Sequence, residues 1–132
     1  MVIDSSALVA ILLGEPGSDA LTLKLSGARS GRQTPVICAA NWLEAMMVIS
    51  ARLGPPGVQA LGELLDVAEV RTVPADAELV QTAFEAWQRF GKVQHPAGLN
   101  FGDCFAYALA LRRGEALLFK GKDFSQTDVL QA

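Results

Sequence analysis

Four acidic side chains stand where a strand or loop leads into a helix or a turn. Asp4 directly follows the apolar run that opens the chain, and Asp123 comes four residues after a late apolar run. Glu44 and Asp103 lie within the first turn or so of two helical segments. Carboxylate oxygens without sulfur or imidazole partners favour a hard cation such as Mg²⁺ or Mn²⁺. The pattern therefore predicts a divalent-metal site if the fold brings these acids together.

The surroundings of two of these acids strengthen the metal hypothesis. Asp103 is followed by the apolar run CFAYALAL, and Glu44 lies in the mostly apolar stretch WLEAMM. Acids in such surroundings are rarely left unpaired, and the basic clusters at 24–32, 112–113 and 120–122 are not obvious partners. Two like charges about 4 Å apart repel by ~4 kcal/mol at an effective dielectric constant of about 20. A divalent cation would remove that repulsion.

Each acid also has an ordinary structural explanation. Asp4 is placed to cap a helix that starts at the next residue. Glu44 and Asp103 each follow an asparagine by three residues, which fits the spacing of a capping box. Asp123 fits a turn. The structural and functional roles are compatible, because an acid can complement a helix amino end and still face a cleft.

Short apolar runs alternate with helical segments along the chain. Strand-like runs occupy 1–3, 34–38, 70–73 and 117–119, with 128–130 as a candidate final strand. Helical patterns occupy 5–13, 16–26, 41–53, 58–67, 76–90 and 101–113. Strands separated by one or two helices imply right-handed crossovers and a parallel sheet covered on both faces. We therefore expect an α/β fold, a three-layer sandwich with a central parallel sheet flanked by helices, whose active site lies beyond the carboxyl ends of the strands.

The composition fits one globular domain over 1–132. The 51% hydrophobic and 19% charged residues exclude intrinsic disorder and hint at apolar surface covered by a partner. A net charge of −3 excludes a wholesale basic coat for nucleic acid, though not a local basic patch. Cys38 and Cys104 fit small buried side chains in a reducing compartment. Without an apolar run of about 18 residues or a signal peptide, we expect no membrane contact and a cytoplasmic location.

Four segments resemble the ordered motifs of PIN-domain proteins, and most closely those of VapC-type toxins of bacterial toxin–antitoxin pairs. The segments are MVIDSSAL at 1–8, AANWLEA at 39–45, GLNFGDCFAYALA at 98–110 and LLFKGKDF at 117–124. The resemblance covers essentially the whole chain. Relatives differ in where the last acid falls, and Gly121 occupies one of the positions expected for it. We assign this role to Asp123, with Asp128 as the alternative.

The resemblance implies a Mg²⁺-dependent endoribonuclease in which Mn²⁺ can substitute. Asp4, Glu44, Asp103 and Asp123 would hold one or two metal ions, and Ser6 matches the small hydroxyl residue that orients the first acid. The metal would activate a water molecule as nucleophile and stabilise charge on the scissile phosphate. The residues agree with this mechanism, because the cysteine beside Asp103 lies in an apolar run and the chain has only one histidine.

The resemblance also implies three kinds of partner: an RNA substrate, a second copy of the chain and a cognate VapB-type antitoxin. The antitoxin would lay an extended or helical tail across the toxin and block the acidic cleft, often with an arginine. Apolar helical segments at 8–13 and 43–49 are candidates for that groove and for the homodimer face. RNA contact would come from basic residues that flank the last two motifs, namely Arg112, Arg113, Lys120 and Lys122.

Two other classes of function stay open. One is a catalytically inactive PIN-like module that binds RNA or protein, although the presence of all four acids argues against it. The other is phosphotransfer, as in receiver or haloacid-dehalogenase-like domains, which also place an aspartate at a strand end. The dehalogenase pattern expects a second functional residue, usually aspartate, at the position of Ser6. A receiver expects paired acids near the start of the chain, which this sequence lacks.

Overall fold

The computed structural model describes residues 1–31 and 33–132, and within these ranges four strands form one parallel sheet. The strands are β1 (Val2–Ile3), β2 (Val36–Cys38), β3 (Arg71–Val73) and β4 (Leu117–Leu118), in the order β3-β2-β1-β4. The inner strand β1 pairs Val2 with Val36 on one side and with Leu117 on the other. Arg32, the last residue of the basic cluster at 24–32, lies outside the described residues.

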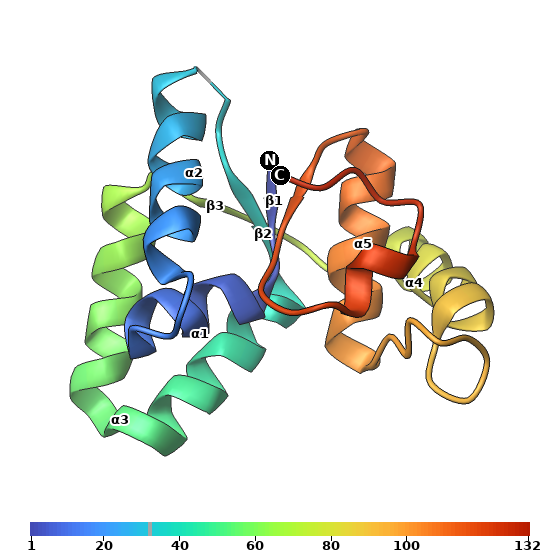
Figure 1. Cartoon of the computed structure of the whole chain (residues 1–132), viewed down its shortest axis with the longest axis horizontal. Coiled ribbons are helices and arrows are strands. Elements are labelled where there is room, and N and C mark those ends of the chain that lie inside the picture. Colours follow the sequence, from blue (N-terminus) through green and yellow to red (C-terminus); the bar gives the residue numbers. More distant parts are fainter. Residues whose placement is uncertain (32) are drawn as a thin grey trace.

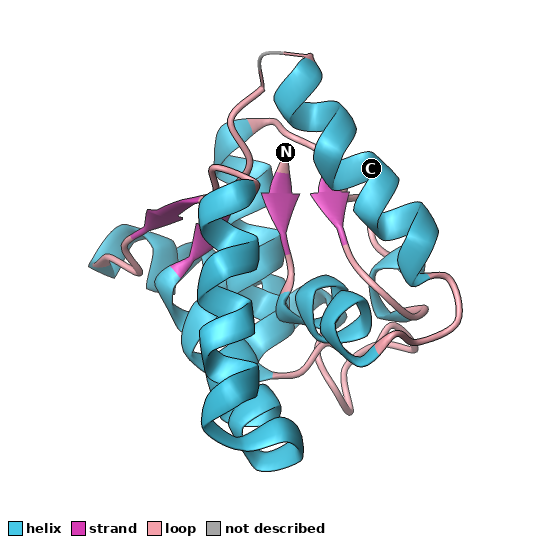
Figure 2. Ribbon diagram, turned by 90° about the vertical axis from the view of Figure 1, so that its left-hand side faces the viewer, coloured by secondary structure: helices cyan, strands magenta, loops and turns pink. Residues whose placement is uncertain are grey.

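Helices cover both faces of the sheet. They are α1 (Ser5–Leu13), α2 (Ser18–Ser30), α3 (Ala39–Val67), α4 (Ala77–Phe90) and α5 (Phe101–Arg113). Val2, Val36 and Leu117 pack with α4 and α5, and the residue after each of them packs with α1, α2 and α3. Figure 1 shows the two groups of helices on opposite sides of the strands, and Figure 2 looks onto the side covered by α1–α3. The predicted three-layer α/β sandwich with a parallel sheet is confirmed.

A bend in α3 joins the helices predicted at 41–53 and 58–67 into one element. Gly54 at the bend has φ 67° and ψ −161°, a conformation essentially restricted to glycine. Pro55 and Pro56 follow, where the helical hydrogen-bond ladder is already interrupted and their missing N–H groups cost little. The second half of α3 returns beside α2 (Figure 1), where Arg29 Nη1 donates to the carbonyl of Val67 at 3.1 Å.

Two predicted boundaries differ from the structure. The helix expected at 16–26 begins at Ser18 and ends at Ser30, with Gly17 before it in the left-handed region at φ 88°. The candidate strand at 128–130 is wrong, because the end of the chain meets β4 only through the isolated parallel bridge between Leu117 and Gln131.

Cys38 and Cys104 are buried free thiols, as the sequence predicts. No helix in the part of the chain that the structure describes combines the length and apolar character needed to span a membrane.

Replacing Gly54 tests the bend in α3. Alanine is strained at φ 67° and ψ −161°, so we expect Gly54→Ala to lower the free energy of unfolding by about 1–3 kcal/mol. Gly62→Ala is the matched control in the same helix, where an added Cβ meets nothing within 4 Å. There alanine should raise the free energy of unfolding by about 0.5–1 kcal/mol. Urea denaturation compares the two variants, and effects of the same sign would contradict the bend.

Candidate active site

Asp4 follows β1 and caps α1, as the sequence predicts. Its backbone is extended, with φ −84° and ψ 151°, and its Oδ2 accepts hydrogen bonds from Ser6 N at 3.0 Å and Ser6 Oγ at 2.5 Å. Only 1% of Asp4 is exposed. Ser6 Oγ also accepts from the backbone N–H of Lys120 at 3.0 Å. The predicted Ser6 hydroxyl thus lies on the first acid and ties it to the loop after β4.

Glu44 comes from the start of α3 and contacts both neighbouring helices. The hydroxyl of Ser5 donates to Glu44 Oε1, and a Cβ added at Gly102 would overlap the Glu44 carboxylate. A glycine at this point of α5 therefore leaves the space that the carboxylate fills. The predicted capping role of the preceding asparagine is wrong, because α3 begins at Ala39 and Asn41 is buried inside the helix.

Asp103 lies in the first turn of α5 within the predicted capping box. Asn100 Oδ1 accepts from the backbone N–H of Asp103 at 2.9 Å, and Asp103 Oδ2 accepts from the backbone N–H of Asn100 at 2.9 Å. Asp103 is only 6% exposed. One carboxylate oxygen of Asp103 is thus held by the backbone at the start of α5, as one oxygen of Asp4 is held at the start of α1.

The structure separates the two candidates for the fourth acid. Asp123 is exposed, begins the short 3-10 helix η1 (Asp123–Gln126) and lies near enough to Asp103 for its charge to raise the pKa of that residue. Asp128 instead accepts from the Tyr107 hydroxyl at 2.5 Å and pairs with Arg89 at 2.9 Å. Asp123, and not Asp128, therefore stands with the other three acids.

Burial and mutual repulsion disfavour ionisation of the two buried acids. Burial is the largest cause that raises the pKa of Asp4 to about 6, and the charge of Glu44 raises it further while hydrogen bonds from Ser6 lower it. Burial likewise raises the pKa of Asp103 to about 7, with further increases from the charges of Asp4, Asp123 and Glu44. The four carboxylates thus act on one another electrostatically, although they come from distant parts of the sequence.

Within residues 1–31 and 33–132, none of the four acids forms an ion pair with a basic group. Over the same ranges, no three His, Cys, Asp or Glu side chains are already arranged as a metal-coordinating group. The chain therefore brings the acids into electrostatic contact without closing them into a coordination sphere.

The predicted RNA-binding basic residues divide between the two ends of the sheet. Arg112 pairs with Asp76 and Arg113 with Glu115 at the end of α5, about nine residues and ~13 Å along the helix from Asp103. Although they flank the third motif in sequence, these two arginines do not border the acidic edge, because a helix carries its last turn away from its first. Lys120 and Lys122 do lie in the loop between β4 and Asp123, and the Lys120 ammonium donates to the carbonyl of Pro16.

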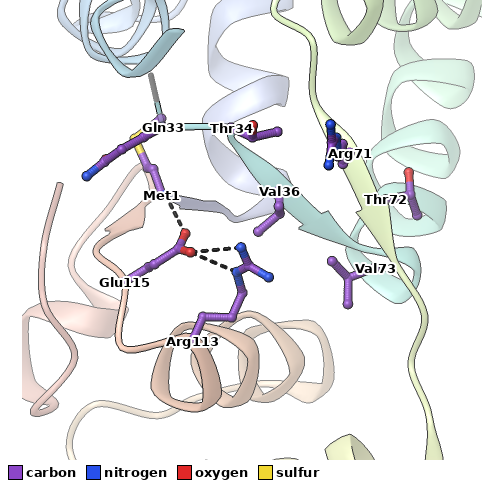
Figure 3. Close-up of a pocket in the computed structure, with 9 residues that line it drawn as sticks. All are labelled: Met1, Gln33, Thr34, Val36, Arg71, Thr72, Val73, Arg113 and Glu115. Carbon is purple, nitrogen blue, oxygen red and sulfur yellow. Dashed lines mark hydrogen bonds and ion pairs between the residues drawn. The ribbon is translucent and has the colours of Figure 1, made fainter. Parts of the chain in front are cut away.

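A cavity of about 480 Å³ opens at the opposite edge of the sheet from the acids. Figure 3 shows its lining, in which Glu115 binds both the Met1 amine at 2.5 Å and the Arg113 guanidinium at 2.8 Å. Arg71 and Thr72 from β3 line its other wall. None of the four acids lines this cavity. The volume of a cavity therefore does not identify the acidic site, which is recognised by its carboxylates.

Three residues that shape the acidic site are missing from the sequence prediction: Ser5, Asn41 and Gly102. Asn41 Nδ2 donates to the carbonyl of Gly102 at 2.9 Å and lies 3.5 Å from Asp4 Oδ1. These contacts join different helices, so no local spacing reveals them. The available signal is weak: Ser5 and Gly102 are small residues directly beside predicted acids.

The chain is similar over almost its whole length to proteins of one family. A family model for the PIN domain matches residues 1–130. The Ribonuclease VapC of Mycolicibacterium smegmatis is 46% identical over 129 residues, which cover 98% of this chain and 97% of the relative.

Two solved structures share the fold at low sequence identity. One is VapC20 of Mycobacterium tuberculosis, described as a sarcin–ricin loop cleaving toxin, with a TM-score of 0.77 and 16% identity over 99% of this chain and 97% of that chain. The other is VapBC2 from Rickettsia felis bound to a DNA fragment from their promoter, with a TM-score of 0.74 and 13% identity over 98% of this chain and 94% of that chain. At these identities the likeness shows a shared fold alone.

The raised pKa of Asp103 predicts an unusual effect on stability in metal-free buffer. Because the folded-state pKa of about 7 lies above the ordinary aspartate value of 3.8, the folded protein binds the proton more tightly, and stability falls as pH rises from about 4 to 7. Asp103→Asn should remove this fall in stability, because asparagine does not ionise. At about 1.4 kcal/mol per pKa unit, the variant should exceed the parent in free energy of unfolding at pH 8 by more than about 1 kcal/mol.

Asp128→Asn is the control of opposite sign. Hydrogen bonds from Tyr107 and Arg89 hold the pKa of Asp128 below its usual value, so this variant should be less stable than the parent at pH 8. Thermal melts at pH 4.5 and pH 8 with a chelator present compare the three proteins. A less stable Asp103→Asn protein at pH 8 would show that burial and repulsion do not dominate at this residue.

Proposed function

Since this chain belongs to the PIN-domain family and is a VapC ribonuclease toxin of the VapBC toxin–antitoxin type, we propose that its acidic edge is the RNA-cleaving centre. Asp4, Glu44, Asp103 and Asp123 are the proposed ligands of Mg²⁺, for which Mn²⁺ can substitute. The observation that carries this proposal is the convergence of four carboxylates, two of them almost fully buried, with no basic partner among the described residues.

The residues present fit a hard divalent cation. All four side chains offer carboxylate oxygens, which Mg²⁺ and Mn²⁺ prefer. The charges of Asp4, Glu44 and Asp123 raise the pKa of Asp103, and a cation among them would reverse that effect by favouring the ionised form. The Ser5 hydroxyl already binds Glu44, which holds this carboxylate beside the start of α1, next to Asp4.

The chain's own contribution is to orient the carboxylates. When bound, Mg²⁺ lowers the pKa of a water molecule and stabilises charge on the phosphate. Ser6 holds Oδ2 of Asp4, and Asn100 holds Oδ2 of Asp103. Ser5 holds Oε1 of Glu44. Each acid that comes from a helix start therefore keeps one oxygen fixed by the protein.

No thiol competes as the nucleophile. Cys104 is only 5% exposed, and burial raises the pKa of its thiol to about 11. The group is therefore protonated at neutral pH and packs as a small apolar side chain. Hydrolysis by an activated water molecule is the mechanism that the site supports.

The substrate is RNA, bound through its phosphates near the loop after β4. Lys120 and Lys122 lie in this loop, three residues and one residue before Asp123. Phosphate contacts of this kind position the backbone without reading the base sequence. The choice of cleavage site therefore rests on RNA shape and on other surface loops.

Exposed apolar side chains beside the acids support a VapB-type antitoxin as partner. Leu43 and Met47 of α3 and Phe101 of α5 are 54%, 64% and 80% exposed, and they line a groove of about 310 Å³ that includes Glu44. An apolar tail in this groove would bring an arginine to the carboxylates. Fewer residues of the segment 8–13 can contact a partner than the sequence suggests, because Leu8 is fully buried in the core.

A second apolar groove supports the homodimer. It has a volume of about 460 Å³ and runs between α4 and α5, lined by Val80, Ala83, Phe84, Trp87, Phe101, Cys104 and Phe105. Phe84 and Trp87 stack on each other at 6.1 Å and are 53% and 38% exposed. Large exposed aromatic side chains are enriched at protein interfaces. We assign this face to a second copy of the chain.

Cleavage of a pool of tRNA and ribosomal RNA tests the proposed function. The parent should cleave with Mg²⁺ or Mn²⁺ and not with EDTA, and Asp4→Asn should lose cleavage because it removes a buried ligand. Asp128→Asn is the matched control and should cleave like the parent, since Asp128 binds Tyr107 and Arg89 instead. Cleavage by Asp4→Asn at the parental rate would overturn the metal site. A parent that neither cleaves nor gains thermal stability from metal would favour a binding module.

Gly102→Ala tests the placement of Glu44. The added Cβ would overlap the Glu44 carboxylate, so this acid must move and we expect cleavage to fall on the order of tenfold or more. Gly27→Ala, where a Cβ meets nothing within 4 Å, should keep the parental rate. Equal rates for the two variants, with unchanged circular dichroism, would show that Glu44 is not needed in its observed position.

A further inference from the structure

Asn41 occupies the point where the elements that carry three of the four acids meet. It lies in the first turn of α3, one turn before Glu44, and is fully buried. Its Nδ2 donates to the carbonyl of Gly102 at 2.9 Å and faces Asp4 Oδ1 at 3.5 Å. Both neighbours are hydrogen-bond acceptors, so the amide orientation is set by its surroundings.

The contacts of Asn41 cross-link parts of the fold that electrostatics pushes apart. Asp4 follows β1, and Gly102 directly precedes Asp103 at the start of α5. The charges of these two aspartates repel, as the effect of Asp4 on Asp103 shows. A donor shared between Asp4 and the backbone beside Asp103 opposes their separation. Asn41 does this from the same helix that carries Glu44.

Packing alone does not account for an asparagine at this position. Asn41 Oδ1 is buried and has no hydrogen-bond partner among the described residues. A buried carbonyl oxygen left unpaired costs about 1–3 kcal/mol. An apolar side chain of similar volume, such as leucine, would avoid that cost. The amide therefore lowers stability through its unpaired oxygen, which suggests that asparagine is present for the link that its Nδ2 makes between Asp4 and α5.

We propose that Asn41 is a positioning residue of the metal site, whose amide fixes Asp4 relative to the amino end of α5 so that Asp4 and Asp103 can share one cation. This inference rests on the proposed metal-dependent function. It assigns no direct metal contact to Asn41. Hydrogen-bond partners of metal-binding carboxylates commonly change metal affinity by about 10–100-fold when they are replaced.

Asn41→Leu removes the link without leaving its partners unsatisfied. Asp4 keeps both hydrogen bonds from Ser6. The Gly102 carbonyl lies in the first turn of α5, where carbonyls accept from the N–H four residues later. The substitution also removes the unpaired Oδ1, so we expect the variant to fold. Asn41→Ser, whose hydroxyl is too short to reach both acceptors, gives a second form of the same test.

Calorimetric titration of the full chain with Mn²⁺ measures the predicted effect. We expect the dissociation constant for Mn²⁺ to rise at least tenfold in Asn41→Leu, with a smaller rise in Asn41→Ser. Ile49→Val is the matched control on α3, because Ile49 is fully buried and packs close to Gly57 of the same helix, away from the acids. It should lower the melting temperature but leave the dissociation constant unchanged. In RNA cleavage, Asn41→Leu should lower kcat and leave KM unaltered.

The outcomes separate this inference from the proposed function. If the parent binds Mn²⁺ and Asn41→Leu binds it equally well, Asn41 has only a structural role and the inference is wrong. If Ile49→Val weakens Mn²⁺ binding as much as Asn41→Leu, general destabilisation explains the loss and the inference is again wrong. If the parent itself does not bind Mn²⁺, the proposed metal site fails and the inference falls with it.

Discussion

Repulsion among carboxylates at one edge of a short sheet is the constraint on which the site depends. Asp4 and Asp103 are almost fully buried, and burial together with neighbouring acids raises the pKa of both. Such a cluster persists in a folded chain only where donors, helix amino ends or a cation compensate the charge. The protein supplies the first two compensations itself. The third would couple the stability of this edge to the binding of the proposed metal ion.

The contacts that start the helices also orient the acids. Asp4 caps α1, and Asp103 closes the capping box of α5, so each carboxylate has one oxygen held by the local backbone. Strands of two or three residues bring these helix starts close together. Gly102 then lets the Glu44 carboxylate lie directly against α5. Fold and site are therefore specified by the same few interactions.

The sequence predicts the helix caps and the type of sheet, but it does not predict contacts between side chains of different helices. The caps formed by Asp4 and Asp103 follow from spacing, and apolar runs separated by helices predict the parallel sheet. The spacing of Asn41 and Glu44 suggests a cap that the structure does not have. The reason is that α3 begins two residues before Asn41, at Ala39, and the local sequence does not show this start. The positions of Arg112 and Arg113 were misjudged because nearness in sequence to a motif says little about which end of a helix faces the site. The preference for Asp123 over Asp128 rests on family resemblance in the sequence. The structure adds two physical reasons, because Asp128 is engaged by Tyr107 and Arg89 and because the charge of Asp123 acts on Asp103.

Anomalous X-ray diffraction from crystals grown with Mn²⁺ would show whether the four acids hold a metal ion. We expect an anomalous peak surrounded by carboxylate oxygens of Asp4, Glu44, Asp103 and Asp123. A peak elsewhere, or no peak in crystals of protein that cleaves RNA with Mn²⁺, would contradict it. In that case the raised pKa values at this edge would reflect burial alone, and the catalytic centre would have to be sought in another part of the chain.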